Sequence, residues 1–328
     1  MKVLESLALA VSLGGMANTL QGQAARDGHI IAPDGVAIHY RVVGAGADTV
    51  LVLHGGPGLT MDYLIPDLSP LAKHHTLVFY DQRGSGRSTA PLDTSHISAR
   101  KHITDLDALR AHFGIAQVAI LGHSWGAKLA VLYAIAHPDR VARMILEGPG
   151  SPKPDARFGR NLIAWADSSA LARITQLREA ALAPANDRVE TCRAFWKEFM
   201  RGYWSDPNDT LSMRRMRGDL CSYAGAMSDM TRVSNLTIAS VGTRDYALDV
   251  RSLRFPVLVL TGRKDPMPLD DSEAWAAAFP DARLVIVERA GHFPHVEQPQ
   301  LVFATIDSFL RGNWPASAKR VERQPNEH

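Results

Sequence analysis

The sequence predicts an α/β protein with a mostly parallel central sheet, helices on both faces of the sheet, and a helical cap inserted between two strands. Three observations lead to this prediction. Apolar, strand-like runs that end at glycine or aspartate recur along the chain, and helix-like segments separate them. A long stretch, 152–253, has no such run. Alternation of strands with helices favours a parallel sheet that is covered on both faces.

The first two strands are expected in the segment HIIAPDGVAIHYRVVGAG, at 29–46. Alternating apolar residues flank Pro33-Asp34-Gly35, and this combination is typical of a turn between two strands. The resulting hairpin would add antiparallel edge strands to the parallel sheet.

Six continuous apolar runs are typical of strands buried on both faces. They occupy 49–58, 76–84, 117–126, 141–150, 256–265 and 282–292. Helices are expected at 61–73, 97–113, 125–137, 270–279 and 299–311. The sheet core is therefore predicted in two parts, 29–151 and 254–312.

The stretch 152–253 contains amphipathic helical patterns at 160–182, 191–204 and 212–233. A connection of this length is too long for a simple loop, so we interpret it as a helical cap. Its tryptophans Trp165, Trp196 and Trp204 are expected either to shape an apolar pocket or to pack inside the cap.

The two ends of the chain are predicted to lie outside the core. Residues 1–28 are typical of a signal peptide or an N-terminal extension, with a lysine, an apolar stretch too short to span a bilayer, and small residues. If residues 1–25 are a signal peptide, the protein is periplasmic or secreted; otherwise it is cytoplasmic. Cys192 and Cys221 fit a disulfide or two free thiols. The polar tail, 313–328, is expected to fray.

Composition excludes several classes of protein. Of the 328 residues, 46% are hydrophobic and 21% charged, which is typical of a globular chain. A formal net charge of +2 leaves no basic excess to neutralise phosphates, so no nucleic-acid partner is expected. The histidines do not combine with cysteines or acidic residues at metal-ligand spacing, so no metal is expected.

The pentapeptide GHSWG, at 122–126, has a strand-like run before it and a helix-like run after it. This is the setting of a nucleophile elbow, in which glycines relieve crowding around a strained serine. Ser124 is therefore the predicted nucleophile. His123 is expected to fill the elbow without a catalytic role, and His295 to start the last helix.

A serine hydroxyl needs a general base, and the base needs an orienting carboxylate. Asp265 and His292 each follow a buried strand, in the chain order Ser…Asp…His that suits this architecture. We therefore predict His292 as base and acid and Asp265 as the orienting group. Asp245 and Glu147 are the alternative carboxylates.

The motif HGGPG, at 54–58, follows the first buried strand. Acyl transfer needs N–H donors aimed at an oxyanion, and glycine lets the backbone approach closely. The amides of Gly56 and Trp125 are the predicted donors, with Gly55 the alternative to Gly56. His54 is expected to brace this loop.

The motif DQRGSGRS, at 81–88, closes the next strand. No phosphate-binding signature accompanies its glycines. Asp81, Arg83 and Arg87 are instead expected to form a buried ion-pair network that holds the HGGPG loop.

With these motifs, the chain resembles the α/β-hydrolase superfamily over about 29–312. HGGPG, DQRGSGRS and HSWG together are similar to the signature of its proline iminopeptidase-like (prolyl aminopeptidase) group. The resemblance implies a serine hydrolase with a helical cap and no cofactor. The chain departs from the group at His123, where the group has glycine, and at Ala127-Lys128. The group binds a free amine through acidic residues of the cap. Here the cap offers Glu179, Glu190, Glu198, Asp206 and Asp219, among others, but the sequence does not match any one of them to that role.

The predicted function is a serine hydrolase that acts through an acyl-enzyme and releases N-terminal proline, or a similar residue, from peptides or amides. An esterase or lactonase with the same triad is the alternative, and a slow-turnover ligand receptor is a lesser one. Hydrolysis of carbon–carbon bonds is also compatible with serine. The expected partner is a small molecule or short peptide, without membrane insertion, and the oligomeric state stays open.

Overall fold

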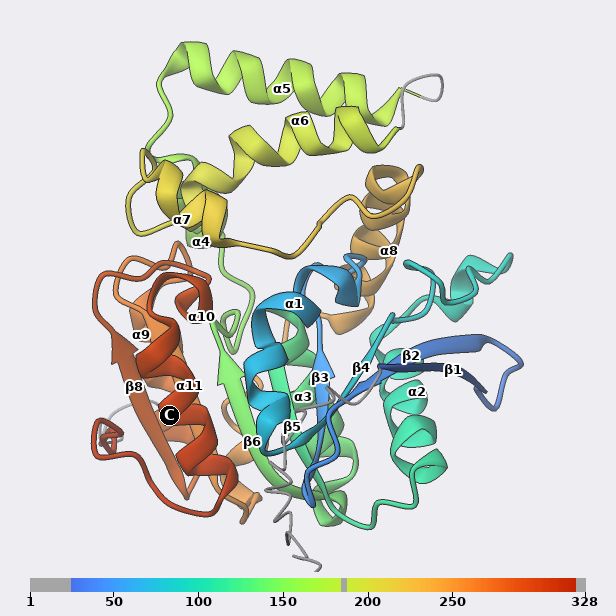
Figure 1. Ribbon diagram of the computed structural model, residues 1–328, viewed down its shortest axis with the longest axis vertical. Helices are drawn as coiled ribbons and strands as arrows, with labels where there is room; N and C mark the ends of the chain where they lie inside the picture. Colours follow the sequence, from blue (N-terminus) through green and yellow to red (C-terminus); the bar gives the residue numbers. More distant parts are fainter. Residues whose placement is uncertain (1–24, 184–187, 323–328) are drawn as a thin grey trace, which may run out of the picture.

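The computed structural model describes residues 25–183 and 188–322 (Figure 1). Within them lies an eight-stranded sheet of order β1-β2-β4-β3-β5-β6-β7-β8. The strands are β1 (Arg26–Ile31), β2 (Ala37–Val43), β3 (Thr49–Leu53), β4 (Thr76–Tyr80), β5 (Val118–His123), β6 (Val141–Glu147), β7 (Val257–Gly262) and β8 (Ala282–Val287). All pairings from β4 to β8 are parallel, whereas β1 and β2 add antiparallel edges, so the predicted fold class is confirmed.

The hairpin of β1 and β2 turns at Gly35, which has a φ of 84° and donates its N–H to Ala32. A positive φ is readily adopted by glycine, which explains the turn that the sequence predicts. Strand β1 begins at Arg26, inside the range expected to be an extension. Residues 1–24, which hold most of the predicted signal peptide, lie outside the described residues.

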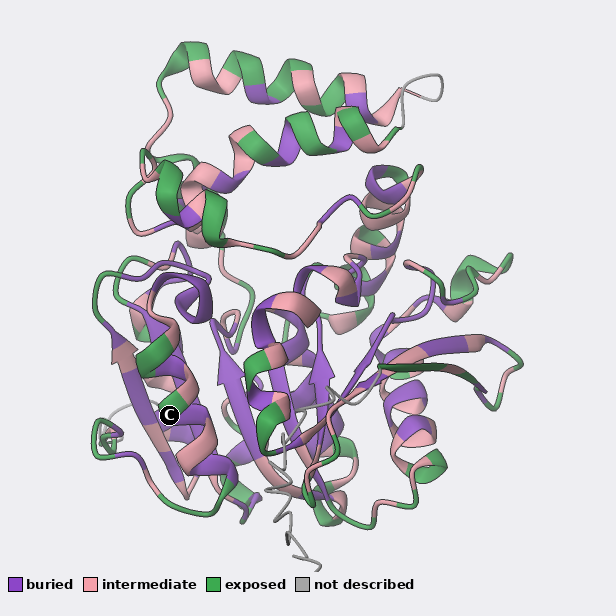
Figure 2. Ribbon diagram, viewed as in Figure 1, coloured by how far each residue is buried: buried purple, intermediate pink, exposed green. Residues whose placement is uncertain are grey.

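Two apolar layers cover the sheet, because successive side chains of a strand point to opposite faces. Leu51 and Leu53 of β3 belong to one layer, together with helices α2 (Ala99–His112), α3 (Trp125–Ala136) and α9 (Leu269–Ala278). Val50 and Val52 belong to the other, with α1 (Ile65–Leu68) and α11 (Pro299–Leu310). Figure 2 shows the inner strands mostly buried. This burial explains why these strands consist mainly of apolar residues.

Between β6 and β7 the chain forms a helical segment, residues 152–253, beyond the carboxyl ends of the strands (Figure 1). Its helices are α4 (Arg157–Ile163), α5 (Ser168–Leu182), α6 (Val189–Phe199), η5 (Met200–Tyr203), α7 (Thr210–Arg215), α8 (Ala226–Val241) and η6 (Asp249–Ser252). None of the helices in the described part of the chain has the length and apolar character needed to cross a membrane.

The prediction of a helix over 212–233 is wrong for the middle of that range, because 216–225 is not helical. Gly218 packs so closely on Tyr63 that an added Cβ would lie 1.9 Å from the Tyr63 carbonyl oxygen. A disulfide also joins Cys221 to Cys192 of α6, which resolves the question that the sequence leaves open. Both constraints come from distant parts of the chain.

The tail does not fray over its described part, 313–322. Lys319 exchanges two backbone hydrogen bonds with Leu284 of β8, and the Trp314 ring lies 4.5 Å from the guanidinium of Arg283. These contacts hold this part of the tail against β8, contrary to the expectation from its polar composition.

Candidate active site

Ser124 stands between β5 and α3 with φ 58° and ψ −122°, a conformation that L-residues rarely adopt. The flanking glycines make it possible. A Cβ on Gly122 would lie 2.4 Å from the Gly126 carbonyl oxygen, and one on Gly126 would lie 2.1 Å from that of Leu53. The backbone is therefore that of a sharp strand-to-helix elbow, with Ser124 at the amino end of α3.

His292 and Asp265 follow β8 and β7 and lie in contact. Nδ1 of His292 is 2.9 Å from Oδ1 and 3.0 Å from Oδ2 of Asp265, and both side chains are buried. A carboxylate only accepts, so Nδ1 carries the proton and Nε2 of the neutral ring is free to act as a base. Asp265 also accepts the amide of Met267 at 2.8 Å, which fixes its orientation.

Glu147 and Asp245, the alternatives to Asp265 as the orienting carboxylate, have other hydrogen-bond partners. Glu147 pairs with Nδ1 of His295 at 2.8 Å, and both side chains are buried. Burial lowers the pKa of His295, but the charge and hydrogen bond of Glu147 outweigh it and raise that pKa above its ordinary value. Asp245 accepts the amide of Ala247. His295 lies in a separate short helix, α10 (Pro294–Glu297), and does not start α11.

In the HGGPG loop, Gly55 donates its amide to the hydroxyl of Tyr63 at 2.7 Å, so this alternative oxyanion donor is already engaged. In the described structure no hydrogen bond is found for the amide of Gly56, which has φ 115°. Trp125 is the first residue of α3, where a helical N–H has no carbonyl partner in its own helix. Of the three amides predicted as possible oxyanion donors, those of Gly56 and Trp125 therefore remain candidates.

The expected Asp81–Arg83–Arg87 network is only partly present. Asp81 accepts the amides of Met61 and Arg87, each at 2.9 Å, and so links the DQRG segment to the chain just after HGGPG. Arg83 instead pairs with two carboxylates that are distant in sequence, Asp105 at 2.5 Å and Asp34 at 3.0 Å. That part of the expectation is wrong, because the partners of Arg83 come from α2 and the first hairpin.

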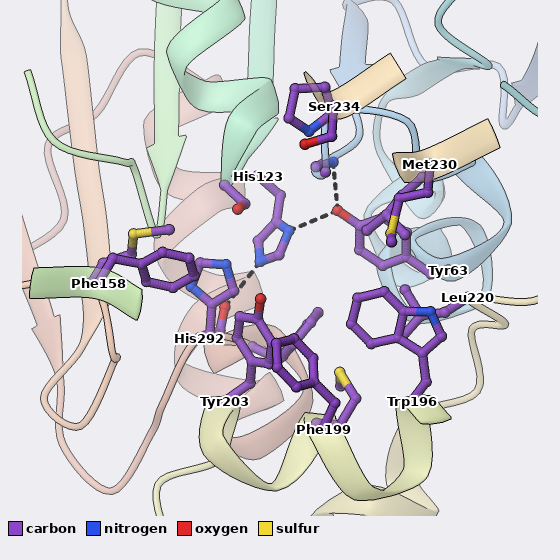
Figure 3. A pocket seen from close by; sticks show the side chains of 18 residues that line it. Tyr63, His123, Phe158, Trp196, Phe199, Tyr203, Leu220, Met230, Ser234 and His292 are labelled. Carbon is purple, nitrogen blue, oxygen red and sulfur yellow. Dashed lines mark hydrogen bonds between the residues drawn. The ribbon is translucent and has the colours of Figure 1, made fainter. Parts of the chain in front are cut away.

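A cavity of about 210 Å³ opens beside Ser124 and His292, which both line it. Figure 3 shows His292 among other side chains of the lining. The helical segment supplies most of its apolar wall: Phe158, Trp196, Phe199, Met200, Leu220 and Met230. The polar groups that the segment adds are the hydroxyls of Tyr203 and Ser234 and the indole N–H of Trp196. Among the described residues that line the cavity, none carries a carboxylate.

Only one of the three tryptophans singled out from the sequence lines this cavity. Trp165 packs against the guanidinium of Arg201, 4.1 Å from the ring centre, and Trp204 packs on Phe293. In the described part of the chain, no cluster of three metal-ligating side chains is found.

The family model described as "alpha/beta hydrolase fold" matches residues 48–299, which is most of the chain. The protein belongs to the α/β-hydrolase family. A proline iminopeptidase of Heyndrickxia coagulans is 27% identical over 269 residues, covering 81% of this chain and 91% of that protein. A proline iminopeptidase of Saccharolobus solfataricus is 26% identical over 276 residues, covering 83% and 87%. The resemblance to the proline iminopeptidase-like group is thereby confirmed.

Other α/β-hydrolase relatives carry different names. A putative 2-succinyl-6-hydroxy-2,4-cyclohexadiene-1-carboxylate synthase of Bacillus subtilis is 26% identical over 86% of this chain and 97% of that protein. Among solved structures, VinJ aligns with a TM-score of 0.68 at 20% identity, over 87% of this chain and 98% of that chain. An esterase from Thermogutta terrifontis aligns with a TM-score of 0.64 at 22% identity, over the same shares. These structures support the fold, and the protein is a hydrolase.

Three side chains that line the cavity of this α/β-hydrolase could not be predicted from the sequence. Tyr63, Tyr203 and Ser234 line the cavity but belong to no motif. Tyr63 and Tyr203 lie in segments predicted to be helical, and Ser234 directly follows one. A hydroxyl-bearing residue in an otherwise apolar helix face is the only signal that the sequence offers for them.

Proposed function

We propose that this protein hydrolyses esters or related carbonyl substrates through an acyl-enzyme, with Ser124 as nucleophile, His292 as base and acid, and Asp265 as the group that orients His292. The contact of His292 with Asp265 and the elbow at Ser124 support these roles. The serine oxygen attacks the carbonyl carbon while its proton passes to Nε2 of His292. The leaving group then takes that proton, and water, activated by His292, releases the acid and restores the serine.

The negative charge that develops on the carbonyl oxygen needs fixed donors. We assign the amides of Gly56 and Trp125 to this task. The amino end of α3, which begins at Trp125, adds a partial positive charge in the same place. The helical segment 152–253 acts as the cap that closes the cavity and selects the substrate.

The lining of the cavity favours a substrate whose acyl part is uncharged and apolar. A protonated amine that leaves water needs a negative partner, and its burial without one is costly. The described lining residues supply aromatic and methionine side chains and two hydroxyls from the cap, but no carboxylate. This single observation favours small carboxylic esters or lactones over substrates with a free amine.

Release of an N-terminal proline is the second candidate. The proline iminopeptidases among the curated relatives favour it, as do the three motifs that this chain shares with their group. A pyrrolidine ring is itself apolar and suits aromatic walls, but the described residues that line the cavity supply no carboxylate for its ammonium.

The experiment has two steps on purified protein. A fluorophosphonate probe should label the wild type and not Ser124→Ala; equal labelling of both would refute the nucleophile. Proline p-nitroanilide is then compared with short-chain p-nitrophenyl esters and a lactone. A higher kcat/KM for the esters or the lactone supports our proposal, whereas a preference for the anilide establishes the second candidate. Normal labelling without any turnover would point to a ligand receptor.

A further inference from the structure

Side chains hold both polar groups of Gly55, the residue before the proposed oxyanion donor. Its N–H donates to the hydroxyl of Tyr63 at 2.7 Å, and its carbonyl oxygen lies 2.9 Å from Nδ1 of His54. That carbonyl shares one planar peptide group with the amide of Gly56, and the two point in opposite directions in a trans peptide. Whatever fixes the oxygen of Gly55 therefore also aims the N–H of Gly56.

The first connection runs from the residue after Ser124. The indole N–H of Trp125 donates to Oε1 of Gln82 at 2.9 Å, and Nε2 of Gln82 donates to the His54 carbonyl at 2.8 Å. The backbone amide of Gln82 also donates to Nε2 of His54 at 3.0 Å. Since that nitrogen accepts, Nδ1 of the neutral ring carries the proton and donates to Gly55. Burial lowers the pKa of His54, which keeps the ring neutral.

The second connection runs from the residue before Ser124. Nε2 of His123 lies 2.9 Å from the carbonyl oxygen of His292, which only accepts, so Nε2 carries the proton. Nδ1 of His123 then carries no proton and accepts a hydrogen bond from the hydroxyl of Tyr63, with 2.8 Å between the nitrogen and the oxygen (Figure 3). The Tyr63 oxygen in turn accepts the N–H of Gly55. Burial holds the pKa of His123 well below its usual range, in keeping with a neutral ring.

We propose that His54, Tyr63, Gln82 and His123, here called the Gly55 frame, are positioning residues that hold the Gly55–Gly56 peptide against the elbow and aim the amide of Gly56 at the oxyanion. The frame reaches Gly55 from both neighbours of Ser124 and also holds the carbonyl of His292. The inference rests on the proposed function, because it presupposes the roles of Ser124 and Gly56.

The test removes single atoms or groups from the frame. Tyr63→Phe deletes the oxygen that joins Gly55 to His123, and Gln82→Met independently deletes the amide that joins Trp125 to His54. Tyr133→Phe is the matched control, because it removes the hydroxyl of another buried tyrosine, which lies in α3 and donates to Asp107 of α2 at 3.1 Å. Loss of an oxyanion donor costs about 10²–10³-fold in kcat, so a misaimed donor should cost roughly 10–100-fold.

The readouts are kcat and KM for the best ester of the panel, and the inhibition constant of an alkyl boronic acid, which forms a tetrahedral adduct on a serine. In both frame variants kcat should fall, the inhibition constant should rise by a similar factor, and KM should change little. Tyr133→Phe should leave all three near wild type. A purely structural role would lower the amount of folded protein, as thermal melting reports, without weakening boronate binding to the folded fraction.

Retention of kcat and boronate affinity within about twofold of the control, in either folded variant, would overturn the proposal. Ser124→Ala separates this failure from the failure of the proposed function. If Ser124→Ala keeps its turnover, the proposed function is wrong. If Ser124→Ala is inactive while Tyr63→Phe and Gln82→Met are normal, only the frame is wrong.

Discussion

The carboxylate of Glu147 lies 2.8 Å from Nδ1 of His295, and this buried pair is separate from the contact of Asp265 with His292. The ring of His123 packs against both histidines, with its centre 4.8 Å from that of His292 and 5.6 Å from that of His295. Only the pair of Asp265 with His292 has its histidine in the lining of the cavity. Replacement of the carboxylate should therefore affect mainly kcat in the pair of Asp265 with His292, and mainly stability in the pair of Glu147 with His295.

Replacement of each carboxylate by its amide tests this difference. Asp265→Asn should lower kcat by on the order of 10⁴-fold, because the amide no longer holds the correct tautomer of His292. Glu147→Gln should keep most of the kcat of the folded enzyme but lose about 1–3 kcal/mol of stability, because the amide nitrogen replaces an oxygen that has no partner in the described structure and becomes a buried donor without an acceptor. Urea titrations and ester kinetics on both variants check this. A loss of kcat in Glu147→Gln comparable with that in Asp265→Asn would contradict the assignment of the acid.

A buried histidine outside the active site makes stability depend on pH. Burial, with smaller contributions from the charges of Arg83 and His54, lowers the pKa of His102 to about 3. Its Nε2 lies 3.1 Å from the hydroxyl of Thr237, on helix α8. Because the folded pKa is depressed, the stabilisation is present above pH 6.5, the ordinary value, and is lost as the pH falls toward 3.

The expected slope for His102 is about 1.4 kcal/mol per pH unit below that ordinary value. Wild type and His102→Leu should therefore differ in unfolding free energy by roughly 2 kcal/mol more at pH 7.5 than at pH 5, in favour of the wild type. Urea unfolding at the two pH values measures this change. An equal difference at both would show that His102 does not carry the pH dependence.

Gly148 supports the contact of His292 with Asp265 by having no side chain. A Cβ there would lie 3.0 Å from Nδ1 of His292 and 3.1 Å from Oδ2 of Asp265, and φ is 54°. Gly148→Ala should therefore lower kcat by roughly 10–100-fold, since small misplacements of catalytic groups are costly. Gly35→Ala is the control, because Gly35 also has a positive φ but an added Cβ meets nothing within 4 Å. If the two variants lose the same activity, backbone strain alone explains the effect.

The disulfide between Cys192 and Cys221 joins α6 to the non-helical stretch 216–225. Its removal in Cys192→Ser/Cys221→Ser should cost about 2–4 kcal/mol, because the unfolded chain gains freedom. Limited proteolysis should then cut within 216–225 before the sheet core. Added reductant should accelerate cleavage of the wild type and leave the double variant unchanged. Equal cleavage of oxidised wild type and double variant would contradict a stabilising role.

The sheet and the elbow could be predicted because their signals are local. Uninterrupted apolar runs mark the strands buried on both faces, and the glycines at 122 and 126 mark the tight contact of the elbow with its neighbours. Asp265 and His292 could be placed at the same sheet edge because parallel strands align their carboxyl ends.

The remaining features depend on contacts between distant parts of the chain. Arg83 finds Asp34 and Asp105, neither of which has a motif that marks it as a partner. Tyr63 meets His123 across 60 residues, and it reads in the sequence as an ordinary helical aromatic residue. The break at 216–225 follows from packing of Gly218 on Tyr63 and from a disulfide, neither of which leaves a local pattern.

The helical segment leaves the sheet after β6 and returns to it in β7, and these two strands are direct neighbours, with Glu147 opposite Leu260. The points of departure and return therefore stay at a fixed separation, whatever lies between them. We therefore expect the register of β6 and β7 to depend on their own pairing more than on the helices between them. On the proposed function, a chimera that carries 152–253 of a relative should acquire the substrate preference of that relative while Ser124, Asp265 and His292 stay those of this chain.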